Sequence, residues 1–139
     1  MALVMGLVLT GCASPSETAG ADARQTCENL GYNDASESAD EDSSGNATDT
    51  WSAGKWAEVA EDLDEEVNRA ARAARADRSW DRLSNAVTDF QRLTELKATI
   101  ENTSLPQADR DAAQAQHEAL NGPEVVRAME QECRKALAD

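Results

Sequence analysis

The sequence predicts an all-α protein: a small helical bundle of about four helices in residues 51–139, joined by a disulfide bond to a short helix in residues 22–32. Apolar residues after position 50 recur at the period of an amphipathic helix. No segment is rich in the β-branched and aromatic residues that favour strands. The third observation is a pair of cysteines near the two ends of this region, which could tie the short helix to the bundle.

Two apolar stripes predict two consecutive helices between Trp51 and Ile100. The first begins with Ser52 as N-cap, and Trp51 and Trp56 occupy the two positions of a hydrophobic staple. The stripe jumps in phase near residues 77–79, so we expect a turn there; one long helix with partners on two faces is the alternative. The first stripe consists of Trp56, Val59, Ala60, Leu63, Val67, Ala70, Ala71 and Ala74, and the second of Trp80, Leu83, Val87, Phe90, Leu93, Leu96 and Ile100.

Two further helices are predicted after residue 103. Ser104 and Gln107 match a capping box, and Pro106 lies in the first turn, where its missing N–H is harmless. The core face of this helix holds only small residues, so we expect it to be the most weakly held element. This face consists of Ala108, Ala112, Ala115 and Ala119. Asn121-Gly122-Pro123 ends the helix and begins the last one, whose stripe consists of Val126, Met129, Cys133 and Leu137.

The segments that flank the short helix differ from the rest in composition. Residues 12–21 are predicted to be a flexible tether. Residues 33–50 are predicted to be a disordered acidic loop, because they hold six carboxylates, no basic residue and no apolar residue larger than alanine. Calcium binding through Asp40, Glu41 and Asp42 is the alternative, but EF-hand spacing is missing and a solvated spacer is favoured.

Cys27 and Cys133 are expected to form a disulfide bond. Cys27 shares a helical face with Ala23 and Leu30, and Cys133 lies in the middle of the last apolar stripe. Two such cysteines in an exported chain are most simply paired, with two buried reduced thiols as the alternative. A bridge that closes a loop of about 106 residues would stabilise the fold by about 4 to 5 kcal/mol in the chain-entropy view.

An apolar run from Ala2 to Leu9 ends in Leu9-Thr10-Gly11-Cys12. This tetrapeptide resembles the lipobox of bacterial lipoproteins, in which a leucine, a small residue and a glycine or alanine precede the cysteine. The resemblance implies that residues 1–11 are a signal peptide that is removed and that Cys12 carries the lipid. The alternative is an ordinary buried element followed by a chance thiol. A membrane span would need about 20 apolar residues.

The chain carries a formal net charge of −14. A field of this sign repels phosphates, so we expect no non-specific binding to nucleic acid or to a bare anionic membrane surface. The lipid on Cys12 must therefore supply the attachment, and two or more acyl chains suffice for it without a basic patch. We expect the protein at the extracytoplasmic face of the cell membrane.

The residues offer few groups for catalysis. His117, the only histidine, lies on a polar face beside Gln116 and Glu118 and is expected to be solvated. The carboxylates of residues 62–66 form an exposed acidic face, and the sequence has no phosphate-binding loop, nucleophile elbow or zinc spacing. We therefore expect no enzyme, cofactor, metal or small-molecule substrate. A cell-wall hydrolase is the alternative, and it requires a pocket that holds a carboxylate pair.

One constellation could serve an interaction, a row of five arginines at spacings of three and four. It consists of Arg69, Arg72, Arg75, Arg78 and Arg82. These arginines could present a basic ridge to an anionic envelope component or a protein, but pairing with Glu65 and other nearby acids on a solvated face is favoured. Trp51, Trp56 and Trp80 could likewise anchor an interface, although at helical spacing they more often fill a core.

The layout of lipobox, early cysteine and a C-terminal Glu132-Cys133-Arg134 segment resembles that of small lipoproteins from actinobacteria and their prophages. The resemblance implies a place in the cell envelope. We therefore expect a non-enzymatic protein that binds an unidentified envelope protein. The alternative is a prophage-encoded superinfection-exclusion or immunity lipoprotein, which also needs no active site.

Overall fold

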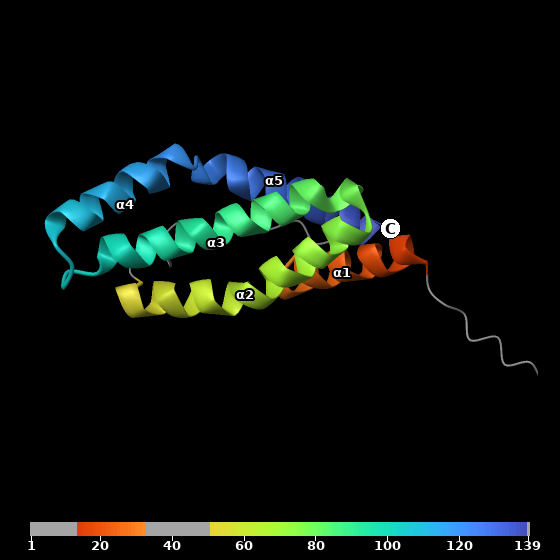
Figure 1. Cartoon of the computed structure of the whole chain (residues 1–139), viewed down its shortest axis with the longest axis horizontal. Helices are drawn as coiled ribbons and strands as arrows, with labels where there is room; N and C mark the ends of the chain where they lie inside the picture. Colours follow the sequence, from red (N-terminus) through yellow and green to blue (C-terminus); the bar gives the residue numbers. More distant parts are fainter. Residues whose placement is uncertain (1–13, 33–50, 139) are drawn as a thin grey trace, which may run out of the picture.

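A computed structural model describes residues 14–32 and 51–138, and within these ranges every regular element is a helix and none is a strand. The prediction of an all-α protein is confirmed. Five α-helices follow one another, with a short 3₁₀ turn, η1, between the second and third (Figure 1). Their bounds are α1 Pro15–Asn29, α2 Ala53–Ala76, η1 Arg78–Trp80, α3 Asp81–Glu101, α4 Gln107–Ala119 and α5 Gly122–Ala138. The predicted signal peptide, Cys12 and the acidic loop of residues 33–50 lie outside the described residues.

Helix α1 begins at Pro15, seven residues before the predicted start at residue 22. Most of the segment predicted as a flexible tether, residues 12–21, is therefore helical, and that prediction was wrong for residues 15–21. The physical reason is a capping box. The Glu17 amide donates to the Ser14 hydroxyl (3.3 Å), and the Ser14 amide donates to the Glu17 carboxylate (2.8 Å). Pro15 occupies the first turn, where its fixed φ suits a helix.

The start of α2 and its separation from α3 agree with the prediction. Ser52 caps the helix by accepting from the Lys55 amide, and the Trp51 and Trp56 rings lie 4.9 Å apart, as a staple requires. The helix ends at Ala76 because Asp77 is extended (φ −146°), and its side chain then caps η1. The phase jump therefore marks a real break.

The start and buried face of α4 differ from the prediction. Ser104 donates its hydroxyl to Asn102 instead of capping the helix, and Pro106 is an N-cap without a side-chain hydrogen bond. The four predicted core alanines are exposed, and only Ala113 is buried. The helix turns a different face to α3. This face includes Arg110, His117 and Leu120, which are partly buried because their longer side chains reach the surface on which the helix packs.

The core lies where α1, the second half of α2, the first half of α3 and α5 meet. Trp80, Leu83 and Val87 of η1 and α3 are almost fully buried there. In α5 the stripe begins at Val125, and the predicted Val126 is exposed (37%), while the other three members are buried as predicted. No helix among the described residues meets the length and apolarity that a membrane crossing requires.

The molecule is elongated (Figure 1). The first turn of α1, the junction of α2 and α3, and the last turn of α5 gather at one end, which we call the Trp80 end. Helix α4 and the α3–α4 turn lie at the opposite end, which we call the distal end.

Candidate functional site

A disulfide bond joins Cys27 of α1 to Cys133 of α5. The two Cα atoms lie 5.3 Å apart, and both side chains are fully buried in the core. The bond closes a loop across 106 positions and ties the first helix to the last. The predicted pairing is therefore present, and the alternative of two reduced thiols is not.

The predicted arginine row does not act as a single ridge. Arg69 pairs with Glu65 four positions before it, as the favoured interpretation requires. Arg72 and Arg82 instead reach other helices, to Asp22 of α1 (3.5 Å) and to Glu132 of α5 (3.7 Å). Arg75 and Arg78, the remaining two of the row, are exposed and form no ion pair with any described residue. They line a shallow groove where α2 meets α3.

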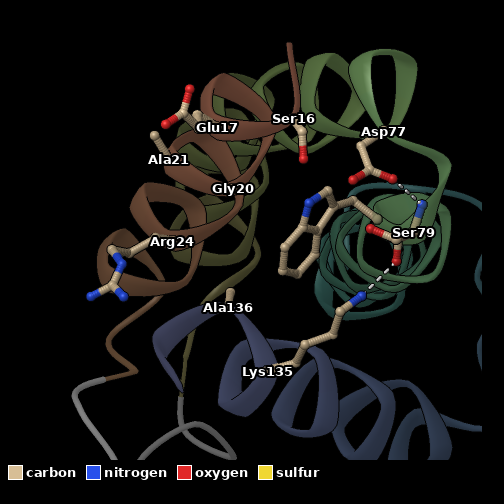
Figure 2. Close-up of a pocket in the computed structure, with 10 residues that line it drawn as sticks. Ser16, Glu17, Gly20, Ala21, Arg24, Asp77, Ser79, Lys135 and Ala136 are labelled. Carbon is tan, nitrogen blue, oxygen red and sulfur yellow. Dashed lines mark hydrogen bonds between the residues drawn. The ribbon is translucent and has the colours of Figure 1, made fainter. Parts of the chain in front are cut away.

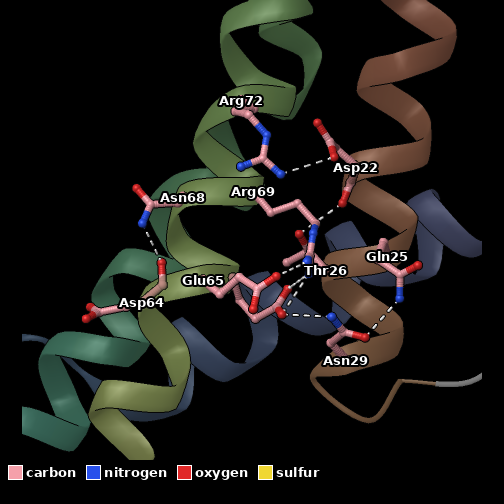
Figure 3. Close-up of polar contacts among 10 residues, drawn as sticks. Asp22, Gln25, Thr26, Asn29, Asp64, Glu65, Asn68, Arg69 and Arg72 are labelled. Atoms are coloured by element: carbon pink, nitrogen blue, oxygen red, sulfur yellow. Dashed lines mark hydrogen bonds and ion pairs between the residues drawn. The ribbon is translucent and has the colours of Figure 1, made fainter.

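A buried ion pair within α2 is joined to α1 by a hydrogen bond from Asn29 (Figure 3). Arg69 donates to both oxygens of Glu66 at 2.7 and 2.6 Å, and these side chains are only 13% and 10% exposed. Asn29 of α1 donates its amide to the same carboxylate (2.8 Å). Burial lowers the pKa of Arg69, but the hydrogen bonds and charge of Glu66, helped by Glu65, outweigh it and raise the pKa overall.

Sequence reasoning missed this pair because it treated Glu66 as part of an exposed acidic face. The signal was present, since Glu66 follows Leu63 by three positions and precedes Ala70 by four, on the buried side of α2. Arg69, three positions later, supplied the charge that a buried carboxylate needs.

A pocket of about 500 Å³ lies at the Trp80 end, between α1, η1 and α5 (Figure 2). Lys135 crosses it, donating to the Ser79 carbonyl (2.7 Å) and placing its ammonium 4.0 Å from the centre of the Trp80 ring. Its lining residues are Ser16, Glu17, Gly20, Ala21, Arg24, Asp77, Ser79, Trp80, Lys135 and Ala136.

This pocket contains two carboxylates, but neither has the character of a general acid. Hydrogen bonds from Ser79 hold the pKa of Asp77 below its usual value, and hydrogen bonds from Ser14 do the same for Glu17. A glycoside hydrolase needs one carboxyl whose pKa is raised, so that it is protonated at neutral pH. Both groups act as helix caps, and the arrangement does not favour the hydrolase alternative.

The other singled-out residues divide between core and surface. Trp80 is a core residue with 3% of its surface exposed, whereas Trp51 and Trp56 are half-buried at the start of α2. His117 was expected to be solvated, but it is partly buried and lies near Lys97 of α3. Burial lowers its pKa below 6.5, and the positive charge of Lys97 lowers it further.

Metal-ligating side chains do not gather in groups of three or more within residues 14–32 and 51–138. The chain matches no known protein family, and no curated protein or solved structure shows significant similarity to it.

Proposed function

We propose that the chain is a lipid-anchored protein of the bacterial envelope, which acts without catalysis by binding another envelope protein. In this proposal residues 1–11 are a signal peptide, lipid on Cys12 enters the cell membrane, and the helices form a bundle on its extracytoplasmic side.

The Cys27–Cys133 disulfide is the observation that carries the proposal. Disulfide bonds persist in exported proteins and are rare in the bacterial cytosol, where thiols are kept reduced. A buried disulfide in the domain and a lipobox before it, ending at Cys12, therefore support the same compartment by independent chemistry.

Several charged side chains are engaged in contacts inside the protein and are not free for catalysis, which supports a binding role. Lys135 of α5 is engaged by Ser79 and Trp80 of η1, and Glu66 of α2 by Asn29 of α1, so these groups hold helices together. Large side chains remain partly exposed at the start of α2, where the Trp51 ring packs at a tilt against the Trp56 ring. Tryptophan is enriched at the centres of protein interfaces, and this pair is the surface we expect a partner to contact.

Metabolic labelling with palmitate tests the anchor. The wild-type chain should incorporate label and sediment with membranes, while Cys12→Ser should do neither. The matched variant Cys27→Ser/Cys133→Ser should keep the label, because its changes lie outside the lipobox. An unlabelled, soluble wild-type chain that still carries residues 1–11 would overturn the proposal.

Site-specific photo-crosslinking in intact cells tests the interaction. A crosslinking residue in place of Trp51 should give one discrete adduct with another envelope protein. The same residue in place of Arg127, an exposed position in α5, should not give it. Absence of any discrete adduct at Trp51, with the chain correctly anchored, would exclude this surface as the binding site.

A further inference from the structure

The charges of α2 and η1 are segregated along their length. Residues 53–66 contain one lysine and six carboxylates, whereas residues 67–80 contain four arginines and one aspartate. Within the second group, Arg75 and Arg78 are exposed and form no ion pair in the described ranges. The basic part of this segment lies at the Trp80 end, and the acidic part extends toward the distal end (Figure 1).

Further basic groups reach the Trp80 end from two other helices. Lys135 of α5 and Arg24 of α1 line the pocket there (Figure 2). The carboxylates nearby are Glu17, Asp77, Asp81 and Glu132. The first two are engaged as helix caps, and Glu132 pairs with Arg82 and Lys135. Arg75 and Arg78 are therefore the outward-facing cations that have the fewest internal partners at this end. Lys135 is 42% exposed but is bound by Ser79, Trp80 and Glu132.

The beginning of α1 sets how far this end can lie from the proposed anchor. Ser14, the N-cap, follows Cys12 by two residues. Two residues of chain span at most about 7 Å. This distance is shorter than the Debye length of about 10 Å at 0.1 M salt, so charges beside the first turn of α1 interact with a surface that holds Cys12. Ser16 and Glu17 of this turn line the same pocket as Asp77 and Lys135.

We propose that the Trp80 end docks on the anionic phospholipid surface into which the lipid of Cys12 inserts, through Arg75 and Arg78, with Lys135 covered by the contact. This inference rests on the proposed function and adds an orientation to it. Glu66, the last carboxylate of the acidic part of α2, lies about 15 Å along the helix from Ala76, beyond the Debye length. The distal end, with α4 and the Trp51–Trp56 pair, then faces away from the membrane toward a partner.

The net charge of −14 does not oppose this arrangement. A free chain would be repelled as a whole, as expected from the sequence. An anchored chain cannot leave the surface, so the unequal distribution of its charges selects which end faces the lipid. The attachment comes from the lipid and the orientation comes from the electrostatics.

The three lysines of the chain provide an internal probe of this orientation. Their side chains are 46% (Lys55), 29% (Lys97) and 42% (Lys135) exposed, so an acylating reagent reaches all three in solution. The full chain, made in a cell-free system under oxidising conditions, is coupled through the Cys12 thiol to maleimide-bearing lipid. The vesicles are either phosphatidylcholine alone or phosphatidylcholine with phosphatidylglycerol, and acetylation of each lysine is followed by mass spectrometry.

On the anionic vesicles Lys135 should be acetylated about fivefold more slowly than on the neutral ones. Each basic residue near an anionic surface raises the ratio of docked to undocked chains by about that factor, and docking covers Lys135. Lys55 and Lys97 should keep their rates, and high salt should restore the rate of Lys135. Equal rates for Lys135 on both vesicles, or protection of Lys55 instead, would overturn the proposal.

The variant Arg75→Gln/Arg78→Gln should lose the protection of Lys135. The control Arg92→Gln/Arg127→Gln removes the same amount of charge from exposed positions away from the Trp80 end, and Lys135 should remain protected in it. Thermal melts by circular dichroism confirm that each variant is folded. Protection that persists in the first variant would contradict the assigned residues.

The acetylation experiment tests the docking surface and the palmitate labelling tests the anchor, so either proposal can be refuted without the other. Chemical coupling at Cys12 does not depend on cellular lipidation, so an unlabelled chain in cells would remove the anchor while leaving the measured orientation intact. Conversely, a labelled chain with unprotected Lys135 would remove only the docking surface.

Discussion

Glu66 occupies a position that the apolar pattern of α2 assigns to the core, and hydrogen bonds from Arg69 and Asn29 satisfy its oxygens. A buried carboxylate without such partners would be strongly unfavourable. The Glu66 carboxylate also links two helices, since Asn29, which donates to it, belongs to α1. A charged residue therefore contributes to how α1 is placed on α2, in addition to the disulfide.

Replacing Arg69 with methionine should destabilise the domain by about 3 kcal/mol, because it leaves the Glu66 carboxylate buried without its charge partner. Glu65→Gln is the matched control. Its side chain is 74% exposed, so loss of this pair with Arg69 should cost no more than about 1 kcal/mol. Urea unfolding followed by circular dichroism measures both. A double variant, Glu66→Leu/Arg69→Met, should regain much of the lost stability, and a failure to regain any would show that the pair acts differently.

His117 should titrate below its ordinary pKa of 6.5, because burial and the charge of Lys97 disfavour its protonated form. As the only histidine, it can be followed without ambiguity by NMR. The unfolded chain then binds this proton more readily than the folded one. The stability contribution is therefore fully present above pH 6.5 and declines as the pH falls from there through the folded pKa.

The variant Lys97→Met should raise the pKa of His117, since it removes the repelling charge, while Lys135→Met, at the other end of the molecule, should leave it unchanged. A pKa of His117 at or above 6.5 in the wild-type chain would show that this face of α4 is not packed on α3 as described.

The helix ends are decided by local hydrogen bonds that are readable in the sequence only in part. The staple and cap at Ser52 were predicted because hydroxyl and apolar residues stood at the expected spacings. The equally regular Ser14-x-x-Glu17 box was missed because the surrounding residues are small and polar and appeared to form a tether. At Ser104 the same pattern led to a wrong prediction of a capping box, because the Ser104 hydroxyl donates to Asn102 within the preceding turn.

Helix α4 should be the first element to open. It buries only Ala113 among its residues, it lacks a side-chain N-cap, and it lies at the end of the molecule away from the core. Hydrogen–deuterium exchange should therefore be faster in α4 than in the buried halves of α2 and α3, where opening requires disruption of the core. Protection of α4 equal to that of α3 would contradict this account of its packing.

The whole molecule is closed by one covalent bond between its first and last helices. Reduction of Cys27–Cys133, or the double serine variant, should lower the free energy of unfolding by about 4 to 5 kcal/mol, because the unfolded chain regains the freedom of a loop across 106 positions. Denaturant midpoints with and without a reducing agent measure the loss. The double serine variant serves as control, since a reducing agent should not change its midpoint further.

The sequence alone determined the helical class, the break between α2 and α3 and the cysteine pairing, because these follow from the period of apolar residues and from the number and faces of the cysteines. Only the tertiary structure decided which arginines remain free, which face of α4 is buried and how near the fold begins to Cys12. The reason is that these properties depend on partners distant in the chain: Asp22, Glu132 and the surface of α3 lie close to them only after folding.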